Sequence, residues 1–335
     1  MAFDIGQQTA DLAAMGKHGF ENRAVKNMQG SPGSEGGFLV RPEWALPVLG
    51  AMYDGDEVLS RVDRVSMFET ANRMIYTALA HDNGGRIGGL ETSWVGERQQ
   101  ITPSTAQLRQ VEYELHKLAA LVYTTDELMQ DVPLLEAELS KWFMQAVAWE
   151  LVNAIINGTG AGQPQGILNS PALSTVAPEA GQVAGTIVWE NLVNMVRRMP
   201  AEHRREAVWL VSGSAELELM QLGQDFGAGS VPVYLPSMVA PNQPYGTLFG
   251  RPVLLTPQCA EVGEVGDIIL CDLGAYKVID SAPKVTPSIH VRYAEGETAV
   301  RFTYRVDGSG IYGEPMLAAD GTTTLSPFVT LGERL

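Results

Sequence analysis

The chain has 335 residues, of which 45% are hydrophobic and 19% are charged, and its formal net charge is −16 with a pI near 4.7. This length can bury a real core and allows two domains, or one large domain with extensions. The acidic chain lacks the cluster of basic residues that a tight nucleic-acid-binding protein needs, so that class is disfavoured. No apolar run reaches the roughly 18 residues of a membrane span, so a membrane-spanning protein is disfavoured as well. Contact with nucleic acid without gripping it stays open.

Residues 1–40 are predicted to form an extended N-terminal arm. Apolar residues are scattered there without a sustained period, and the segment ends in the Gly-, Ser- and Pro-rich stretch GSPGSEGGFL. Asp4 and Asp11 interrupt what would be the apolar region of a signal peptide, so synthesis in the cytoplasm is expected.

Three strand-like segments follow the arm. Residues 57–68 and 73–80 form two runs, and residues 107–123 alternate between apolar and polar side chains before turning apolar on both sides. As one strand, 107–123 would span about 55 Å, far more than a usual strand of about 6 residues, so it must leave the body of the domain. Its expected partner is 73–80, which predicts a long hairpin arm.

The hairpin arm is expected to end in the glycine-rich stretch 78–97. Its glycines match neither G-x-G-x-x-G nor G-x-x-x-x-G-K-[ST], so a flexible tip is favoured over a phosphate site. Because an isolated two-stranded ribbon is marginal in water, we expect the arm to lie on another subunit. The candidate contact residues in this stretch are Gly84, Gly85, Arg86, Gly88, Gly89, Trp94 and Glu97.

Residues 133–157 are predicted to form a long helix. Apolar side chains recur at helical spacing and leave only a narrow polar stripe. At 1.5 Å per residue the helix is about 36 Å long. We expect a central spine that is covered on most sides and is ended by Gly158 and Gly160.

From about residue 186 the predicted helices and strands are short and follow one another closely, which is typical of a compact α/β domain. The predicted elements are a helix over 189–196, a buried strand in EAVWLVS, a helix in AELELMQL capped by Ser212 or Ser214, and strands in GRPVLLT and GDIILCD.

A closing hairpin is predicted from two alternating runs within 288–306, on either side of AEGE. It places His290 and Arg292 near Arg301 and Arg305, which concentrates positive charge in an acidic chain. Two interpretations stay open, a solvated sheet face and a surface that pairs with the acidic flank of another copy. Arg292, Arg301 and Arg305 are therefore further candidates for contact between subunits.

The sequence predicts no catalytic, cofactor or metal site. The five histidines lack metal-binding spacing, and Cys259 and Cys271 fit neither a disulfide framework nor a zinc site, so both are expected as reduced core residues. LVSGSAE does not match G-x-S-x-G, and the acidic cluster within 54–57 is typical of a solvated turn. An enzyme is therefore disfavoured.

Several patterns follow one another in a specific order along the chain. They are W-x-x-E in SWVGE, a Ser/Thr run, the Lys117-Leu118 turn into the core, the acidic DELMQD segment, and N-G-x-G…P-x-G-I between Asn157 and Ile167. LFGRPVLLT, VRFTYRVDG and SPFVTL continue the series, which covers about residues 36–331. In this order the patterns resemble the major capsid proteins of tailed bacteriophages, which have the Hong Kong 97-like fold.

The resemblance implies an α+β Hong Kong 97-like capsid fold with an N-terminal arm, an extended β-hairpin loop, a peripheral domain with a long spine helix, and an axial α/β domain. The expected ranges are the arm at 1–40, the peripheral domain at 41–67 and 109–185 with its return hairpin at 280–312, the extended loop at 68–108, the axial domain at 186–279, and a C-terminal segment packing on the axial domain at 313–335.

The resemblance also implies a structural function. The protein would assemble as hexamers and pentamers into an icosahedral shell that encloses phage double-stranded DNA without sequence-specific binding. Its partners would be its own copies, a scaffolding protein and a portal, with a decoration protein as a further candidate; no membrane is involved. It would be made in the cytoplasm of the host bacterium and end in the virion.

Two alternatives stay open. An encapsulin-type compartment shell has the same fold, but the long arm before Gly36 favours the phage interpretation. A cytoplasmic α/β enzyme would need a cleft with convergent titratable groups.

Two features depart from the family pattern. The chain carries no long N-terminal scaffolding segment, so a separate scaffolding protein or a processed chain is expected. Family members that weld their subunits use a lysine in the extended loop, whereas residues 68–108 contain no lysine. A non-covalent shell is therefore expected.

Overall fold

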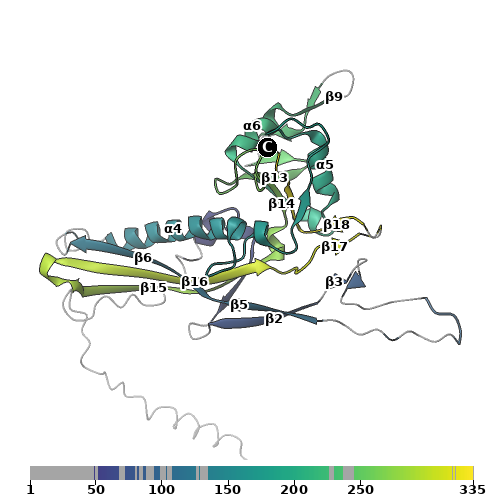
Figure 1. The fold of residues 1–335 in the computed structure, drawn as a ribbon. Helices are drawn as coiled ribbons and strands as arrows, with labels where there is room; N and C mark the ends of the chain where they lie inside the picture. The colour runs from purple at the N-terminus through teal and green to yellow at the C-terminus, as the bar shows by residue number, and fades with distance from the viewer. Residues whose placement is uncertain are drawn as a thin grey trace, which may run out of the picture. The chain divides into compact units, whose positions relative to one another are not determined.

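The computed structural model describes residues 49, 52–67, 72–79, 81–82, 86–87, 94–98, 103, 108–125, 128, 135–225, 230–236, 245–318, 320 and 322–334. The chain divides into a unit of residues 1–39 and a unit of residues 40–335, and every described residue belongs to the second unit (Figure 1). The arm expected at residues 1–40 lies outside the described residues.

A four-stranded sheet and one long helix form the first core. Helix α4 lies along the sheet (Figure 1), and Phe143 of α4 stacks on Phe302 of β16 with ring centroids 4.7 Å apart. β1 runs parallel to β15, and the other neighbouring strands are antiparallel. The strand order is β1-β15-β16-β6, with bounds β1 Asp63–Met67, β15 Tyr276–Arg292, β16 Glu297–Gly310, β6 His116–Thr125 and α4 Leu135–Asn157.

The closing hairpin is confirmed and is longer than the sequence indicated. β15 and β16 pair along their length apart from two register shifts, and the 3-10 turn η6 (Tyr293–Glu295) joins them. β15 contains Pro283 and Pro287, although proline is normally confined to strand edges and bulges. Pro283 lies in the register shift between Ser281 and Lys284, and Pro287 lies beyond the stretch that pairs with β1, where β15 is an edge strand among the described residues.

Among the described residues, only one face of α4 is covered. Trp142 and Trp149 on the other face are 56% and 53% exposed. The expectation of a spine covered on most sides is therefore wrong within one chain, because the layer that packs against a helix contacts only one side of it. The side chains of the buried face are Phe143, Met144, Val147, Leu151, Val152, Ile155 and Ile156.

The strand expected over 107–123 is wrong as one element, because the chain changes sheet at Leu115. The segment before Leu115 pairs with β2 to form the ribbon of the hairpin arm, which confirms the predicted partner, whereas the segment after it pairs with β16. The ribbon strands are β2 Arg73–Leu79 and β5 Leu108–Glu114.

Two hydrogen bonds satisfy the backbone at this change of sheet. The N–H of Leu115 donates to the carbonyl of Asn72 at 2.9 Å, and the N–H of Glu114 donates to the carboxylate of Asp307 at 2.8 Å. The strand can therefore be interrupted without leaving these donors unpaired. No local sequence signal marks this point, since Asp307 comes from the far end of the chain.

The strand expected over 57–68 begins later than the sequence indicated. Its first part is the 3-10 turn η2 (Leu59–Arg61), because Asp56 Oδ1 accepts hydrogen bonds from the N–H groups of Val58 and Leu59 at 2.9 and 3.1 Å. The acidic cluster within 54–57 thus caps a turn, as its sequence interpretation predicts.

The second core is a seven-stranded mixed sheet with the order β11-β12-β13-β8-β14-β19-β7. The predicted strands β8, β13 and β14 and both helices are confirmed, and Ser212 Oγ accepts the N–H of Ala215 at 3.3 Å as the N-cap of α6. β7 and β19 were not predicted. The bounds are β7 Ser174–Val176, β8 Val208–Val211, β11 Tyr234–Leu235, β12 Gly246–Leu248, β13 Arg251–Leu255, β14 Ile268–Cys271, β19 Phe328–Leu331, α5 Trp189–Arg197 and α6 Gly213–Gln221.

Short elements complete the described fold. Two further strand pairs, β9 with β10 and β17 with β18, are antiparallel. Their bounds, with those of the 3-10 turns, are β9 Gly223–Asp225, β10 Ser230–Pro232, β17 Met316–Leu317, β18 Thr324–Leu325, η3 Ile167–Asn169, η4 His203–Arg205 and η5 Leu273–Ala275.

The loop after α4 gives a physical reason for the N-G-x-G…P-x-G-I pattern. The N–H of Gly166 donates to the carbonyl of Gly158 at 2.8 Å, so the loop folds back on the end of the helix. A Cβ at Gly166 would lie 2.5 Å from Gly158 N and 2.6 Å from the carbonyl oxygen of Ile156. Only glycine allows this close approach of backbone to backbone.

Candidate functional site

The hairpin arm is a two-stranded ribbon with exposed apolar side chains. β2 and β5 pair over seven residues each and form a sheet of their own, with Ile75 and Leu108 exposed on it. A shorter pair, β3 (His81–Asp82) with β4 (Arg86–Ile87), follows within the arm. Among the described residues the ribbon has no third strand, which leaves it with little apolar surface of its own to fold on.

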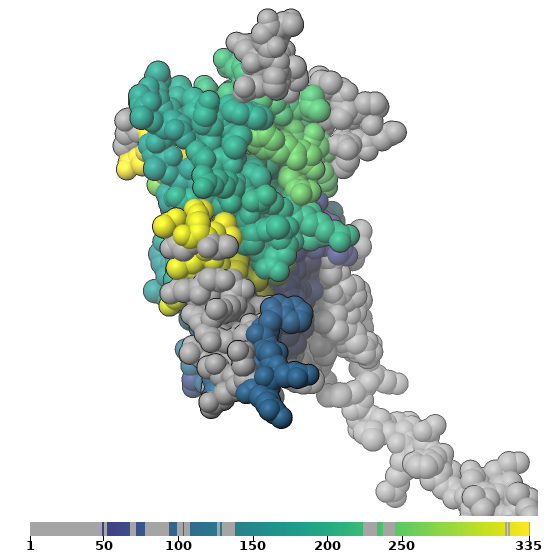
Figure 2. All heavy atoms as spheres, turned by 90° about the vertical axis from the view of Figure 1, so that its right-hand side faces the viewer, coloured from purple at the N-terminus to yellow at the C-terminus, as the bar shows by residue number. Residues whose placement is uncertain are grey.

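Three of the arm's predicted contact residues, Arg86, Trp94 and Glu97, are among the described residues, and the four glycines are not. Arg86 pairs with Asp82 through the backbone of β4 and β3. The side chains of Trp94 and Glu97 are exposed to solvent, and Figure 2 shows atoms of this blue part of the chain at the surface. The glycines of the predicted tip, Gly84, Gly85, Gly88 and Gly89, lie outside the described residues.

Arg292 has partners in its own chain at the end of the closing hairpin. It forms ion pairs with Glu297 at 2.8 Å and Glu295 at 3.4 Å, and its guanidinium lies 4.1 Å from the centre of the Tyr123 ring. The hydrogen bond to Glu297 raises the pKa of the Arg292 guanidinium. His290 lies in the irregular stretch of β15 just before it.

Arg301 and Arg305 lie on the outward face of β16, away from α4. They are opposite Leu121 and Lys117 of β6 and about 13 Å apart along the strand. Arg305 also donates a hydrogen bond to the side chain of Asn72, which directly precedes β2. The structure therefore divides the predicted basic cluster. Arg292 lies at the tip of the hairpin, where it pairs with two glutamates, whereas Arg301 and Arg305 lie along the sheet, with Lys117 opposite Arg305.

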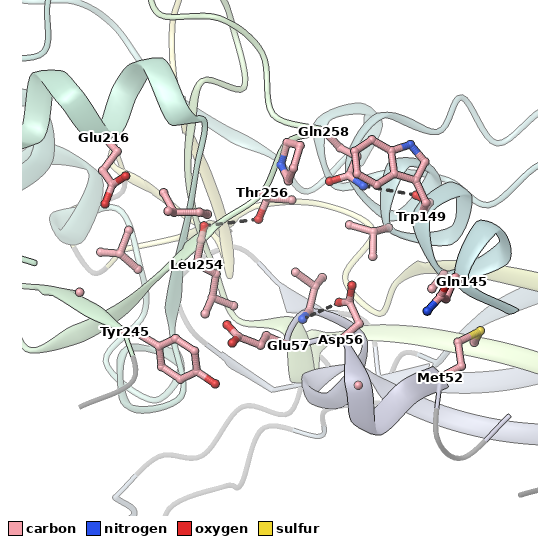
Figure 3. Close-up of a pocket in the computed structure, with 18 of the residues that line it drawn as sticks. Met52, Asp56, Glu57, Gln145, Trp149, Glu216, Tyr245, Leu254, Thr256 and Gln258 are labelled. Atoms are coloured by element: carbon pink, nitrogen blue, oxygen red, sulfur yellow. Dashed lines mark hydrogen bonds between the residues drawn. The ribbon is translucent and has the colours of Figure 1, made fainter. Parts of the chain in front are cut away.

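A groove of about 730 Å³ lies between α4 and the end of β13. Figure 3 shows Gln145 and Trp149 of α4 across the groove from Glu216 and Tyr245, with Glu57 between them. Its apolar wall includes Met52, Met144, Ala148, Val152 and Leu254. The sequence analysis missed this groove, because its lining comes from segments about two hundred positions apart that carry no common motif.

The groove's polar groups are held in place by hydrogen bonds. The Tyr234 hydroxyl donates to Glu216 Oε1 at 2.6 Å, and desolvation together with this carboxylate raises the pKa of Tyr234. Gln258 accepts a hydrogen bond from Asn157 Nδ2 on its carbonyl at 2.9 Å. The groove thus has a fixed shape with carboxylates at one side and apolar walls.

One partly buried cluster of titratable groups was also missed by the sequence analysis. His203 Nδ1 lies 2.7 Å from Asp272 Oδ2, and His203 Nε2 lies 3.0 Å from the Tyr312 hydroxyl. The three residues are far apart in sequence, so no motif could reveal them. His203 bridges the other two residues, and no nucleophile adjoins them in these contacts, so the cluster joins η4, the end of β14 and the segment after β16.

The cysteines are as predicted. Cys259 and Cys271 are free and buried, and burial raises the pKa of the Cys259 thiol to about 12. Within the described ranges no group of three or more His, Cys, Asp or Glu side chains could hold a metal ion. Among the helices of the described part, none is long and apolar enough to cross a membrane.

Comparisons with known proteins agree with this architecture. Residues 36–319 match the model of a family described as the phage capsid family. The major capsid protein of Escherichia phage T5 is 26% identical over 220 residues, which cover 59% of this chain. The chain spans 45% of the length of that curated relative.

Solved structures share the fold at low sequence identity. A chain from the capsid of a native GTA particle computed with C5 symmetry has a TM-score of 0.63 and 18% identity, covering 94% of this chain and 98% of that one. A chain from Mycobacterium phage Cain has a TM-score of 0.55 and 14% identity, covering 82% and 89%. These likenesses confirm the fold class expected from the sequence.

Proposed function

Because the chain belongs to the phage capsid family, whose members are structural proteins of the virion, we propose that it builds an icosahedral shell. Hexamers and pentamers of the chain form the shell, which encloses double-stranded phage DNA without sequence-specific binding. The protein catalyses no reaction in this function. It is made in the cytoplasm of the host bacterium.

The β2–β5 ribbon is the observation that supports this function most directly. Two strands that pair only with each other among the described residues, with apolar side chains exposed, gain stability when a neighbouring subunit covers them. In a protein that stays a monomer, such an extension would gain no stability from burial of its apolar side chains. Trp149 of α4 is 53% exposed and would likewise be covered by a neighbour.

The domain plan proposed for this function follows the order of the chain. It consists of the arm at 1–40, a peripheral domain at 41–67, 109–185 and 280–312, the extended loop at 68–108, an axial domain at 186–279, and the C-terminal segment at 313–335. Pairing of β19 with β14 supports packing of the C-terminal segment on the seven-stranded sheet. β7, at Ser174–Val176, also joins that sheet.

Further partners are part of the proposal. A scaffolding protein and a portal assist assembly, and a decoration protein is a further candidate on the finished shell. The acidic net charge of −16 supports a wall that lies beside DNA without binding it tightly.

Imaging of the purified protein tests the proposal. We expect closed icosahedral shells large enough for a phage genome. Small shells filled with a cargo protein would favour the encapsulin alternative, and soluble protein without shells would favour the enzyme. A variant in which a short turn replaces residues 80–91 tests the role of the arm. We expect it to stay soluble and to keep its circular dichroism spectrum, yet to close no shells.

A further inference from the structure

The segment 94–98 presents an aromatic side chain that no other described residue covers. Trp94 is fully exposed, and the adjacent Val95 is 38% exposed. Aromatic side chains carry a large share of the binding energy at protein interfaces when they are buried in a partner's pocket. Trp94 therefore has the character of an anchor whose pocket lies on another molecule.

The groove between α4 and β13 has the dimensions and chemistry to receive this anchor. Its volume of about 730 Å³ falls in the range of pockets that enclose small organic molecules. Met52, Met144 and Ala148 supply apolar walls, and Trp149 adds an aromatic ring that is about half exposed. An indole and a neighbouring valine thus fit the groove's size and polarity.

The charges beside the anchor and beside the groove are complementary. Trp94 is followed, after two residues, by the exposed pair Glu97 and Arg98. The groove's lining contains Lys141 of α4 and three carboxylates, those of Asp56, Glu57 and Glu216, which Figure 3 labels. In a docked segment we expect Arg98 to approach these carboxylates and Glu97 to approach Lys141.

We propose that Trp94 of one copy inserts into the groove of a second copy. This inference rests on the proposed function, because it needs copies held side by side, and it names the surface that receives the hairpin arm. A second copy is the occupant because Trp94 is exposed in its own chain, because the ribbon lacks a third strand among the described residues, and because the charges match.

Site-specific crosslinking tests the inference directly. Trp94 is replaced by p-benzoylphenylalanine, which keeps an aromatic side chain, and shells of the full chain are irradiated. We expect a denatured band at about twice the subunit mass of 36.2 kDa, with the crosslinks mapped to residues 52–58 or 141–152. Crosslinks within one chain, to residues 1–39 of a neighbour or to a different protein would overturn the groove of a second copy as the receptor.

Two variants add a quantitative test. Trp94→Ala should raise the protein concentration needed for assembly about tenfold or more, as expected for an interface anchor, and Ala148→Phe should do the same by filling the groove. Trp142→Ala is the control, since Trp142 of α4 is also an exposed tryptophan, at 56%, but does not line the groove, and its removal should change assembly less than about threefold. Equal effects of the two tryptophan variants would overturn the assignment.

The failure of this inference is distinguishable from failure of the proposed function. Wild-type shells that assemble normally while position 94 gives no crosslink to the groove overturn the docking inference alone. Wild-type protein that never forms shells overturns the proposed function, and the docking inference with it.

Discussion

At the scale of single residues, a buried ion pair fastens the C-terminal segment to the second core. The side chains of Arg334 and Asp267 are 1% and 0% exposed. Arg334 Nε also donates to the carbonyl of Thr186 at 2.9 Å, and its Nη1 donates to the carbonyl of Gly332 at 3.1 Å. Desolvation raises the pKa of Asp267, and the neighbouring guanidinium opposes this shift. Removing one partner leaves the other as an unpaired buried charge.

Arg334→Ala should lower the free energy of unfolding by about 3–5 kcal/mol, measured by urea unfolding at pH 7. Burial raises the folded-state pKa of Asp267 above its unfolded value, and the substitution removes the guanidinium that opposes this. The folded variant then binds a proton at Asp267 at a higher pH than the wild type does, so the difference in the free energy of unfolding should shrink as the pH is lowered from 7.

Arg205→Ala is the control for this prediction. Arg205 is an exposed arginine that lies 3.5 Å from Glu206, and its removal should change the free energy of unfolding by less than about 0.5 kcal/mol. Equal losses in the two variants, or a loss for Arg334→Ala that is independent of pH, would contradict the role given to the buried pair.

At the scale of elements, the loop after α4 stabilises the fold of one chain, whereas the outward face of the four-stranded sheet is expected to contact another copy. The loop turns back on the helix through contacts that only glycine permits at Gly158 and Gly166, so it belongs to the fold. The outward face carries Arg305 directly opposite Lys117 on paired strands, and Arg301 lies about 13 Å away along β16. Like charges directly opposite each other are destabilising, and we expect carboxylates of a neighbouring copy to reduce this repulsion.

Gly166→Ala should lower the free energy of unfolding by about 1–3 kcal/mol, because the added methyl group would overlap the backbone of the helix end and force it to move. Thermal or urea unfolding measures the change. Gly213→Ala is the matched control, since a Cβ there meets nothing within 4 Å, and it should be neutral or stabilise by about 0.4–1 kcal/mol. A neutral effect at Gly166 would show that the loop relaxes freely.

Replacing Arg301 and Arg305 together by Glu should block assembly at low salt, where electrostatic interactions between subunits are least screened. Sedimentation of shells measures assembly, and circular dichroism measures the fold. Arg205→Glu serves as the control, because this exposed arginine lies in η4, away from the sheet face. If the double variant loses its secondary structure to the same extent as its assembly, the two arginines belong to the fold of one chain.

At the scale of the whole molecule, the chemistry needed for a covalent shell is missing from the arm. Residues 68–108 contain no lysine, and arginine stays protonated and is a poor nucleophile. Lys277, near the base of the arm, already pairs with Asp63 at 2.8 Å and lies over the Tyr76 ring. Both cysteines are buried, where the thiolate is disfavoured.

Mature shells should therefore dissociate fully when boiled in denaturing detergent without a reducing agent. A single band near 36.2 kDa on a denaturing gel is the expected result. The same gel run with reducing agent is the control for disulfides. A ladder of covalent oligomers in either lane would mean that another side chain acts as the nucleophile.

Local physics explains what the sequence by itself determined. The period of apolar residues predicts α4, the continuous apolar runs predict β8 and β14, and Ser212 marks the start of α6, since each signal acts between residues close in sequence. The pairing of β2 with β5 was also predictable, because a glycine-rich stretch separates two runs of matching alternation. The order of these elements was enough to suggest the fold.

Only the tertiary structure decided features that depend on distant partners. The chain leaves one sheet for another at Leu115 because Asp307 accepts a backbone hydrogen bond there, and Arg292 loses its place in a basic face because Glu297 comes opposite it. The groove exists only where α4 and β13 meet, and one face of α4 is uncovered because the packed layer lies on the other. Such features have no sequence signal, since burial and charge pairing are set by which segments fold side by side.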